Sequence, residues 1–243
     1  MYKLIPAGDA PQYDEEAERR FVEEWPEFIF HDAEVRKYSE RRRTYFPEWE
    51  FYFVEDERLI AGCWGVPLAW DGTVADLPGG FTDALALSVT AYEKGVVPNT
   101  FVLMAAAVRS DEQGRGHAAR VITAVRDHAV AHGLGQVIAP VRPTLKVSYP
   151  LTPIETFMTW TRDDGLPLDP WVRTHVRLGA TLLAPAPASQ TMTGSVADWE
   201  KWTKMPFPST GTYTIPAGLT TLEINREADT GRYTEPNIWL RHV

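Results

Sequence analysis

The 243-residue sequence has a single cysteine, Cys63, which excludes an intramolecular disulfide and a cysteine-based metal cluster. Its 24 basic residues are outnumbered by 33 acidic ones, and nucleic-acid binding needs a basic excess. The longest strongly apolar run, FVLMAAAV, is far shorter than the roughly 20 residues that span a bilayer. The N-terminus lacks the pattern of a secretion signal. These absences predict a cytoplasmic protein with neither nucleic acid nor membrane as partner.

The first 95 residues have the composition of two helices, a hairpin and a third helix. One helical stretch opens at Asp14 and a second starts after Phe30. Residues 51–54 and 59–70 predict the two strands of a hairpin around an acidic turn. FTDALALSVTAYEKG, residues 81–95, has helical spacing and ends on a glycine suited to a C-cap.

The central unit is predicted as strand, glycine loop, helix and strand. NTFVLMAAAV, residues 99–108, is a continuous apolar run of the kind buried on both faces of a sheet. After the loop, apolar residues recur at helical spacing and Gly133 ends the helix: Ala118, Val121, Ile122, Val125 and Ala129. GQVIAPVR, residues 135–142, is the next strand. This order implies a parallel or mixed sheet with a crossover helix.

The last third of the chain mixes a short helix with strands. DPWVRTHVRLGA, residues 169–180, begins with an N-cap aspartate and a proline and stops at a glycine, and helical turns are expected near residues 157–160. APAPAS, residues 184–189, is interpreted as a connector and ADWEKWTK, residues 197–204, as a turn. Strands are expected in SQTMTGSV, GTYTIP, LTTLEI and NIWLRHV. We predict a main domain over 1–210 and a β extension over 211–243 packed on the same domain.

SDEQGRGHAARVI, residues 110–122, places glycines between a strand and a helix, where backbone N–H groups and the helix dipole favour an anion. A P-loop would need a Lys-Ser/Thr pair after Gly116, and none follows. A Rossmann fingerprint would need a third glycine where Ala119 stands. A third pattern, [Q/R]-x-x-G-x-[G/A], fits QGRGHA with Gln113, Gly116 and Ala118 at its fixed positions. A plain helix-capping loop is the alternative.

This hexapeptide resembles the acyl-CoA pyrophosphate loop of the GNAT superfamily of N-acetyltransferases. The order of the predicted elements over roughly residues 14–200 matches that family, and HVRLGA, residues 175–180, is similar to its late helix. The resemblance implies an α/β (α+β) fold with a mixed central sheet flanked by helices. In that fold the strands at 99–108 and 136–141 splay apart to form an acyl-CoA cleft, and here a C-terminal β-rich extension follows.

The resemblance also implies acyl-CoA, acetyl or longer, as co-substrate. The loop amides would hold the pyrophosphate, and the end of the preceding strand would pair with the pantetheine arm. The implied cofactor-binding residues are Met104, Ala106 and Val108 on the strand and Gln113, Gly114, Arg115, Gly116, His117, Ala118 and Ala119 in the loop. Arg115 and Arg120 would add charge near the phosphates, or would simply be solvated at the helix start.

The catalytic prediction falls on the late helix. In this family a tyrosine four residues before the glycine of this helix often serves as the acid that protonates the leaving thiolate. Here that position holds His175. With an unperturbed pKa near 6.5, an imidazole can act as acid or base near neutrality. His175 is therefore the predicted catalytic residue. The alternative is a histidine packed with Trp171 and Leu178 in the helix face.

No carboxylate lies on the strand before the loop, so a general base would come from elsewhere or act through water. The candidates are Glu155, Asp163, Asp164 and Asp169, and the last three are better explained as a turn and an N-cap. Tyr149 and Trp160 are predicted walls of the substrate pocket, with a place in the core as the alternative.

Cys63 lies in an apolar strand and is predicted to be an inert thiol. His128 and His132 form an i, i+4 pair, but no carboxylate completes a zinc-enzyme pattern around them. No metal site is therefore expected.

The leading function is direct transfer of an acyl group from acyl-CoA to the amine of a small molecule. The first alternative keeps the fold but acts on acyl or malonyl thioesters with an acyl-carrier protein as partner. The second is a non-catalytic sensor that binds acyl-CoA. The strand-like tail is also suited to form a homodimer.

Overall fold

The computed structural model describes residues 2–23 and 25–242. The strands are β1 Tyr2–Pro6, β2 Glu50–Glu55, β3 Arg58–Leu68, β4 Thr100–Val108, β5 Gln136–Val141, β6 Thr181–Gly194, β7 Gly211–Thr214, β8 Thr221–Asn225 and β9 Thr230–Arg241. The α-helices are α1 Asp14–Val22, α2 Ala33–Tyr45, α3 Phe81–Glu93, α4 His117–Ala131, α5 Ile154–Phe157, α6 Pro170–Arg177 and α7 Val196–Thr203.

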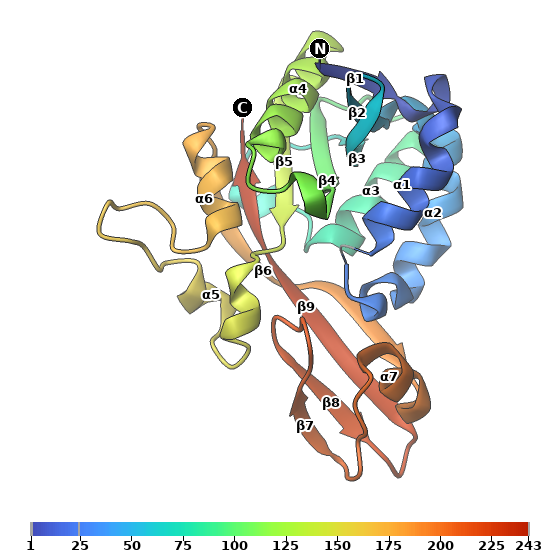
Figure 1. Ribbon diagram of the computed structural model, residues 1–243, viewed down its shortest axis with the longest axis vertical. Helices are drawn as coiled ribbons and strands as arrows, with labels where there is room; N and C mark the ends of the chain where they lie inside the picture. Colours follow the sequence, from blue (N-terminus) through green and yellow to red (C-terminus); the bar gives the residue numbers. More distant parts are fainter. Residues whose placement is uncertain (1, 24, 243) are drawn as a thin grey trace.

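One mixed sheet organises the described residues, in the order β1-β2-β3-β4-β5-β9-β8-β7, with β6 paired to β9. The pair β4–β5 is parallel and the other pairs are antiparallel. In the view of Figure 1, α4 and the group α1–α3 lie on either side of the upper part of this sheet. The predicted mixed sheet flanked by helices is confirmed.

The helix starts follow from their capping residues. The Asp32 side chain accepts hydrogen bonds from the backbone N–H groups of Glu34 and Val35 at the start of α2. Asp169 caps α6 in the same way, with Pro170 at the first helical position. The predicted helix of residues 169–180 is therefore confirmed, together with its cap.

Three local predictions were wrong or incomplete. APAPAS is not a connector but part of the long strand β6, which pairs only with β9 among the described strands and is irregular between Ala186 and Gln190. An edge position tolerates prolines, because it leaves one side of the backbone unpaired. ADWEKWTK is not a turn but forms most of α7, started by a capping box at Ser195. The strand β1 had not been predicted.

Two main hydrophobic cores lie along the sheet. The larger one packs α3, α4, α5 and α6 on β2–β5 and the C-terminal part of β9. The second fills what we call the C-terminal lobe, residues 192–235, around Trp199, Phe207 and Tyr233. In Figure 1 this lobe extends below the rest of the molecule, and β9 runs from it up into the central sheet. The division of the chain at residue 210 stays a prediction.

The strands β4 and β5 separate after a short parallel contact. They pair only over Thr100–Val102 and Gln136–Ile138. The carbonyl of Val137 accepts the N–H of His242, next to β9, so the backbone groups of Val137 point toward β9. Successive residues of a strand point their backbone groups to opposite sides, so those of residues 138 and 140 point toward β4. Residue 140 is a proline and has no N–H to offer β4. Its place in the sequence therefore favours the splayed geometry.

Candidate active site

A cleft opens where β4 and β5 part, with about 490 Å³ of empty space that includes its solvent-open mouth. Its walls are residues 103–106 of β4, residues 139–142 at the end of β5, Trp171 and His175 of α6, Gln190 of β6, Asn237 of β9, and Trp25, Ile29 and Phe81 from the helical side. Most of these side chains are apolar. The polar side chains of the lining are therefore few, and we refer to the part of the cleft that they line as its inner end, to distinguish it from the glycine loop: Arg142, His175, Gln190 and Asn237.

The glycine loop lies between the end of β4 and the start of α4. Gly114 and Gly116 have left-handed backbones, with φ of +78° and +80°, and a Cβ atom at either position would meet nothing within 4 Å. The loop is thus open on its outer side. The N–H groups of the first turn of α4 have no partner within the helix, so they can bind an anion there.

The side chains of this loop form an ion-pair cluster around one buried carboxylate. Glu112 is 3% exposed and is paired with Arg58, with Arg115 at 2.9 Å and with the Nε2 of His117 at 3.3 Å. The nearby guanidinium groups lower the pKa of Glu112 against the effect of its burial. His117 points into this cluster, so its side chain supports the loop from the inside.

The other predicted cofactor residues lie along one path. Met104 and Ala106 line the cleft, and the carbonyl of Val108 accepts a hydrogen bond from the Gln113 side chain at 3.2 Å. Beyond Val102, β4 pairs with β3 but not with β5, so its other backbone edge faces the cleft. Ala118 and Ala119 lie in the first turn of α4. A continuous edge therefore leads from the loop into the cleft.

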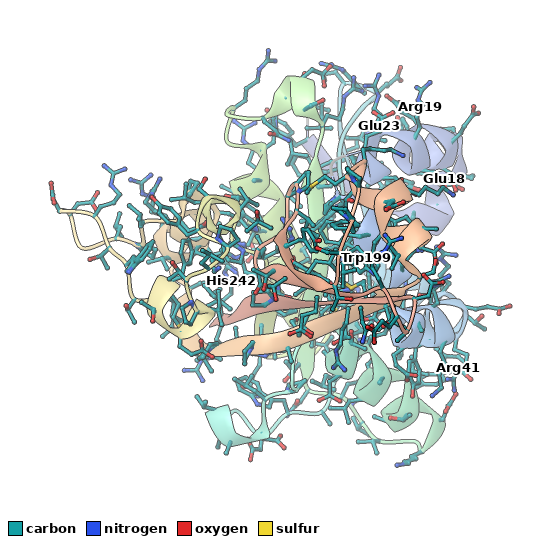
Figure 2. The ribbon with its side chains drawn as sticks, turned by 90° about the horizontal axis from the view of Figure 1, so that it is seen from below. Glu18, Arg19, Glu23, Arg41, Trp199 and His242 are labelled. Carbon is teal, nitrogen blue, oxygen red and sulfur yellow. The ribbon has the colours of Figure 1, made fainter. Side chains whose placement is uncertain are left out.

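His175 is buried at the inner end of the cleft, 1% exposed, with the edge of Trp171 against its ring. Its Nδ1 lies 2.9 Å from the Nε2 of His242, next to the end of β9 (Figure 2). Burial lowers the pKa of His175 to about 3 and that of His242 to about 4. Both rings are therefore neutral near pH 7, and the Nε2 of His175 has no hydrogen-bond partner among the described residues.

The remaining candidates lie away from the cleft. Tyr149 and Trp160 pack edge to face at 4.9 Å beside α5 and are not among the residues that line the cleft, so their role as pocket walls stays a prediction. Asp169 accepts three backbone N–H groups, including that of Leu145 at 2.6 Å, as expected for a cap. Burial raises the pKa of the Cys63 thiol, in keeping with an inert thiol.

Sequence reasoning missed three polar residues of the cleft: Arg142, Gln190 and Asn237. Arg142 follows β5 directly and contacts Glu235, a completely buried carboxylate of β9. Burial raises the pKa of Glu235, and the neighbouring cations oppose that shift. The position of an arginine at the carboxyl end of a buried strand was the one available signal. The sequence around Gln190 of β6 and Asn237 of β9 gave no such signal.

Exposed charges elsewhere belong to the outer surface. Figure 2 shows Glu18, Arg19 and Glu23 on the outside of α1, on the helical side of the molecule. No helix among residues 2–23 and 25–242 has the length and apolar character needed to cross a bilayer. Within the same residues, metal-ligating side chains do not gather in groups of three or more.

No family model matches the chain. The chain is similar to an arginine N-acetyltransferase, avaD, of Aspergillus versicolor, with 27% identity over 90% of this chain and 84% of that protein. Among solved structures it is similar to the loading GNATL domain of CurA from Lyngbya majuscula, with a TM-score of 0.63, 15% identity and coverage of 100% and 97% of the two chains. A second is the GphF GNAT-like decarboxylase in complex with isobutyryl-CoA, with a TM-score of 0.54, 14% identity and coverage of 100% and 98%.

The two solved structures show that the fold is that of the GNAT proteins. The similarity to an arginine N-acetyltransferase, the splayed strands and the glycine loop agree with the resemblance drawn from QGRGHA.

Proposed function

We propose that this acyl-CoA-dependent N-acyltransferase moves an acetyl group from acetyl-CoA to an amine of arginine or of a closely related small molecule. The observation that carries the proposal is the cleft between β4 and β5, which is lined by His175 and by residues 103–106 of the strand that leads into the glycine loop. The similarity to an arginine N-acetyltransferase over 90% of the chain supports this choice of acceptor. Neither a carrier protein nor a dimer is part of the proposal.

The donor would lie along the edge that leads from the loop to the cleft. The amides of residues 114–119 would bind its pyrophosphate, because they combine unpaired N–H groups with the positive end of the α4 dipole. The open edge of β4 beyond Val102 would pair with the amides of the pantetheine arm. With these contacts, the thioester would lie in the cleft beside residues 103–106 of β4.

In the reaction the amine nitrogen attacks the thioester carbon, the C–S bond breaks, and the thiolate takes up a proton. His175 is the one side chain among the described cleft-lining residues able to accept the proton that the amine loses. Its low pKa makes it a weak base, which suffices because the nitrogen becomes acidic as the C–N bond forms. This role needs an unprotonated Nε2 on His175, so the Nδ1–H of His175 would donate to the Nε2 of His242.

The test measures acetylated arginine by mass spectrometry together with the release of free CoA thiol. His175→Asn keeps a polar atom near His242 but removes Nε2, so we expect kcat to fall about 100-fold with little change in the KM for acetyl-CoA. His132→Asn is the matched control, because His132 is an exposed histidine at the end of α4. Its kinetics should stay unchanged.

Two outcomes would count against parts of this proposal. Unchanged kcat in His175→Asn would remove His175 from the chemistry. Thermal stabilisation by acetyl-CoA without any acetylated product, from arginine or from other amines, would instead indicate a protein that binds acyl-CoA without using it.

A further inference from the structure

Arg142 lines the cleft and leaves much of its hydrogen-bonding capacity unused. Its Nε donates to Glu235, and its Nη2 donates to the carbonyl of Ala217 at 2.6 Å. A guanidinium has five N–H donors, so three of them, on Nη1 and Nη2, have no partner among the described residues. The side chain is only 15% exposed, yet the residue lines the cleft. Its remaining donors therefore belong to a half-buried side chain that lines the cleft.

Buried groups next to Arg142 fix the position of its guanidinium. Glu235 is fully buried and also accepts the hydroxyl of Tyr233, whose oxygen in turn accepts the N–H of Leu219 at 2.7 Å. Lys146, 1% exposed, donates to the carbonyls of Tyr149 and Leu219 at 2.8 and 2.6 Å. The guanidinium is therefore fixed by one ion pair and one carbonyl, and its position does not depend on a bound ligand.

The positive charges near Arg142 outnumber the negative ones. Two basic side chains lie near one carboxylate: Arg142 forms an ion pair with Glu235, and Lys146 acts on Glu235 through its charge. No other Asp or Glu is among the described residues that line the cleft. The spare N–H groups of Arg142 are not buried without a partner, so they reach solvent in the free protein, where an anionic group of a ligand can replace water. The neighbouring amides of Gln190 and Asn237 are further polar groups at the same end.

We propose that Arg142 binds a carboxylate of the substrate, and that this carboxylate belongs to the acceptor, which is therefore an amino acid rather than a simple amine. The proposal rests on the proposed transfer to an arginine-like amine. A guanidinium fork matches a carboxylate in a two-point contact. Because an acetyl donor carries no carboxylate, the acceptor supplies it. A malonyl donor would be the other source of the same chemistry.

The first experiment uses the unmodified protein and four substrate pairs. Initial rates are measured with arginine and with agmatine, which is arginine without its carboxylate, each with acetyl-CoA and with malonyl-CoA. We expect kcat/KM with acetyl-CoA to be at least about 100-fold higher for arginine than for agmatine, since a desolvated charge pair is lost. Equal rates for the two acceptors would overturn the proposal, although the transfer itself would stand.

The malonyl-CoA arm separates the two sources of the carboxylate. Preference for malonyl-CoA over acetyl-CoA, with no preference between the two acceptors, would assign Arg142 to the acyl group and overturn the assignment to the acceptor. Absence of product from every pair would instead contradict the proposed transfer.

The second experiment tests Arg142 itself. Arg142→Lys keeps a cation beside Glu235 but loses the planar fork, so we expect the preference for arginine over agmatine to fall at least about tenfold while the rate with agmatine changes little. Arg142→Gln should abolish the preference if it folds. Arg162→Gln, at an exposed arginine paired with Asp164, is the control and should keep the preference of the wild type. A preference that survives Arg142→Lys and Arg142→Gln would also overturn the proposal.

Discussion

The two ends of the cleft offer different kinds of group to a ligand. At the outer end, the loop of residues 114–119 presents backbone N–H groups at the start of α4, and its left-handed glycines leave the surface open. At the inner end, the polar groups are side chains, Arg142 and His175, each held by a buried partner, Glu235 and His242 respectively. One end depends on the course of the main chain and the other on buried side-chain pairs.

This difference determines what each end tolerates. Exposed side chains of the loop, such as Arg115, can change without moving an N–H group, whereas the glycines require a conformation that other residues adopt at a cost and Glu112 and His117 are buried supports of the loop. At the inner end each polar side chain is also a structural partner, so its removal leaves a buried group unpaired. Substitutions at the inner end should therefore affect folding and catalysis together, and those at the exposed positions of the loop should affect donor binding alone.

The largest expected effect is on stability at the inner end. Glu235→Ala leaves Arg142 and Tyr233 without their shared partner, and we expect the free energy of unfolding in urea to fall by about 3–5 kcal/mol. Glu223→Ala, at an exposed position of β8, should change it by less than about 0.5 kcal/mol. Equal losses in the two variants would show that the inner end is no more dependent on its pairs than the surface is.

The next effect is acid destabilisation through the histidine pair. The folded-state pKa values, about 3 for His175 and about 4 for His242, lie below the unfolded value near 6.5. Protons therefore bind the unfolded chain first, and the stability is present above pH 6.5 and lost as the pH falls below it. Each histidine should contribute a loss of about 1.4 kcal/mol per pH unit between pH 6 and 4.

The measurement is urea unfolding at pH 7 and pH 5 for the wild type and for the double variant His175→Phe with His242→Leu. Groups outside the pair, such as Glu235, titrate in both proteins and cancel in the difference. The double variant should lose less stability on acidification. The same loss in both would contradict burial of the pair in the neutral form.

A smaller effect is expected at the loop. Gly116→Ala adds a Cβ atom where the donor phosphate would approach, on a backbone with φ of +80°. We expect the KM for acetyl-CoA to rise about tenfold, equivalent to about 1.4 kcal/mol, with kcat nearly unchanged. Gly133→Ala is the matched control, because Gly133 has φ of +86° at the other end of α4 and nothing within 4 Å. A similar KM rise in both variants would point to strain rather than contact with the donor.

The smallest effect concerns the charged side chains of the loop. Arg115 is 63% exposed and its pair with Glu112 joins a surface group to a buried one. Arg115→Gln should raise the KM for acetyl-CoA less than threefold, equivalent to less than about 0.7 kcal/mol, and less still at high salt. A tenfold rise would mean that the side chain, rather than the backbone, holds the phosphate.

The same contrast explains what could be predicted from the sequence. The loop is local in the chain, so Gln113, Gly116 and Ala118 could be recognised by their spacing, and the neighbouring strand and helix by their apolar periods. The inner end is assembled from residues of three segments that meet only through the pairing of β9 with β5 and β6: Arg142 after β5, Gln190 on β6, and Glu235 and Asn237 on β9. No local pattern relates such positions.

His175 is an intermediate case. Its place in the late helix could be predicted from the resemblance, but its neutral state could not, because His242 lies 67 positions away and comes to it through the last strand. The errors in APAPAS and ADWEKWTK have a related cause. Prolines and short polar stretches indicate turns when taken alone, and here pairing with β9 and packing of Trp199 in the C-terminal lobe override them.

The proline at position 140 leaves the sheet without a hydrogen-bond donor from β5 toward β4 at this point. A residue with an N–H at that position would offer β4 the donor that is lacking, so the strands could close further and the sheet would gain hydrogen bonds at the expense of the cleft. In the proposed complex the donor's own amide groups occupy the vacant edge, and the bound substrate completes the sheet as an extra strand would. Ligand binding and folding stability should then be coupled, with an unfolding temperature that rises with the concentration of acetyl-CoA.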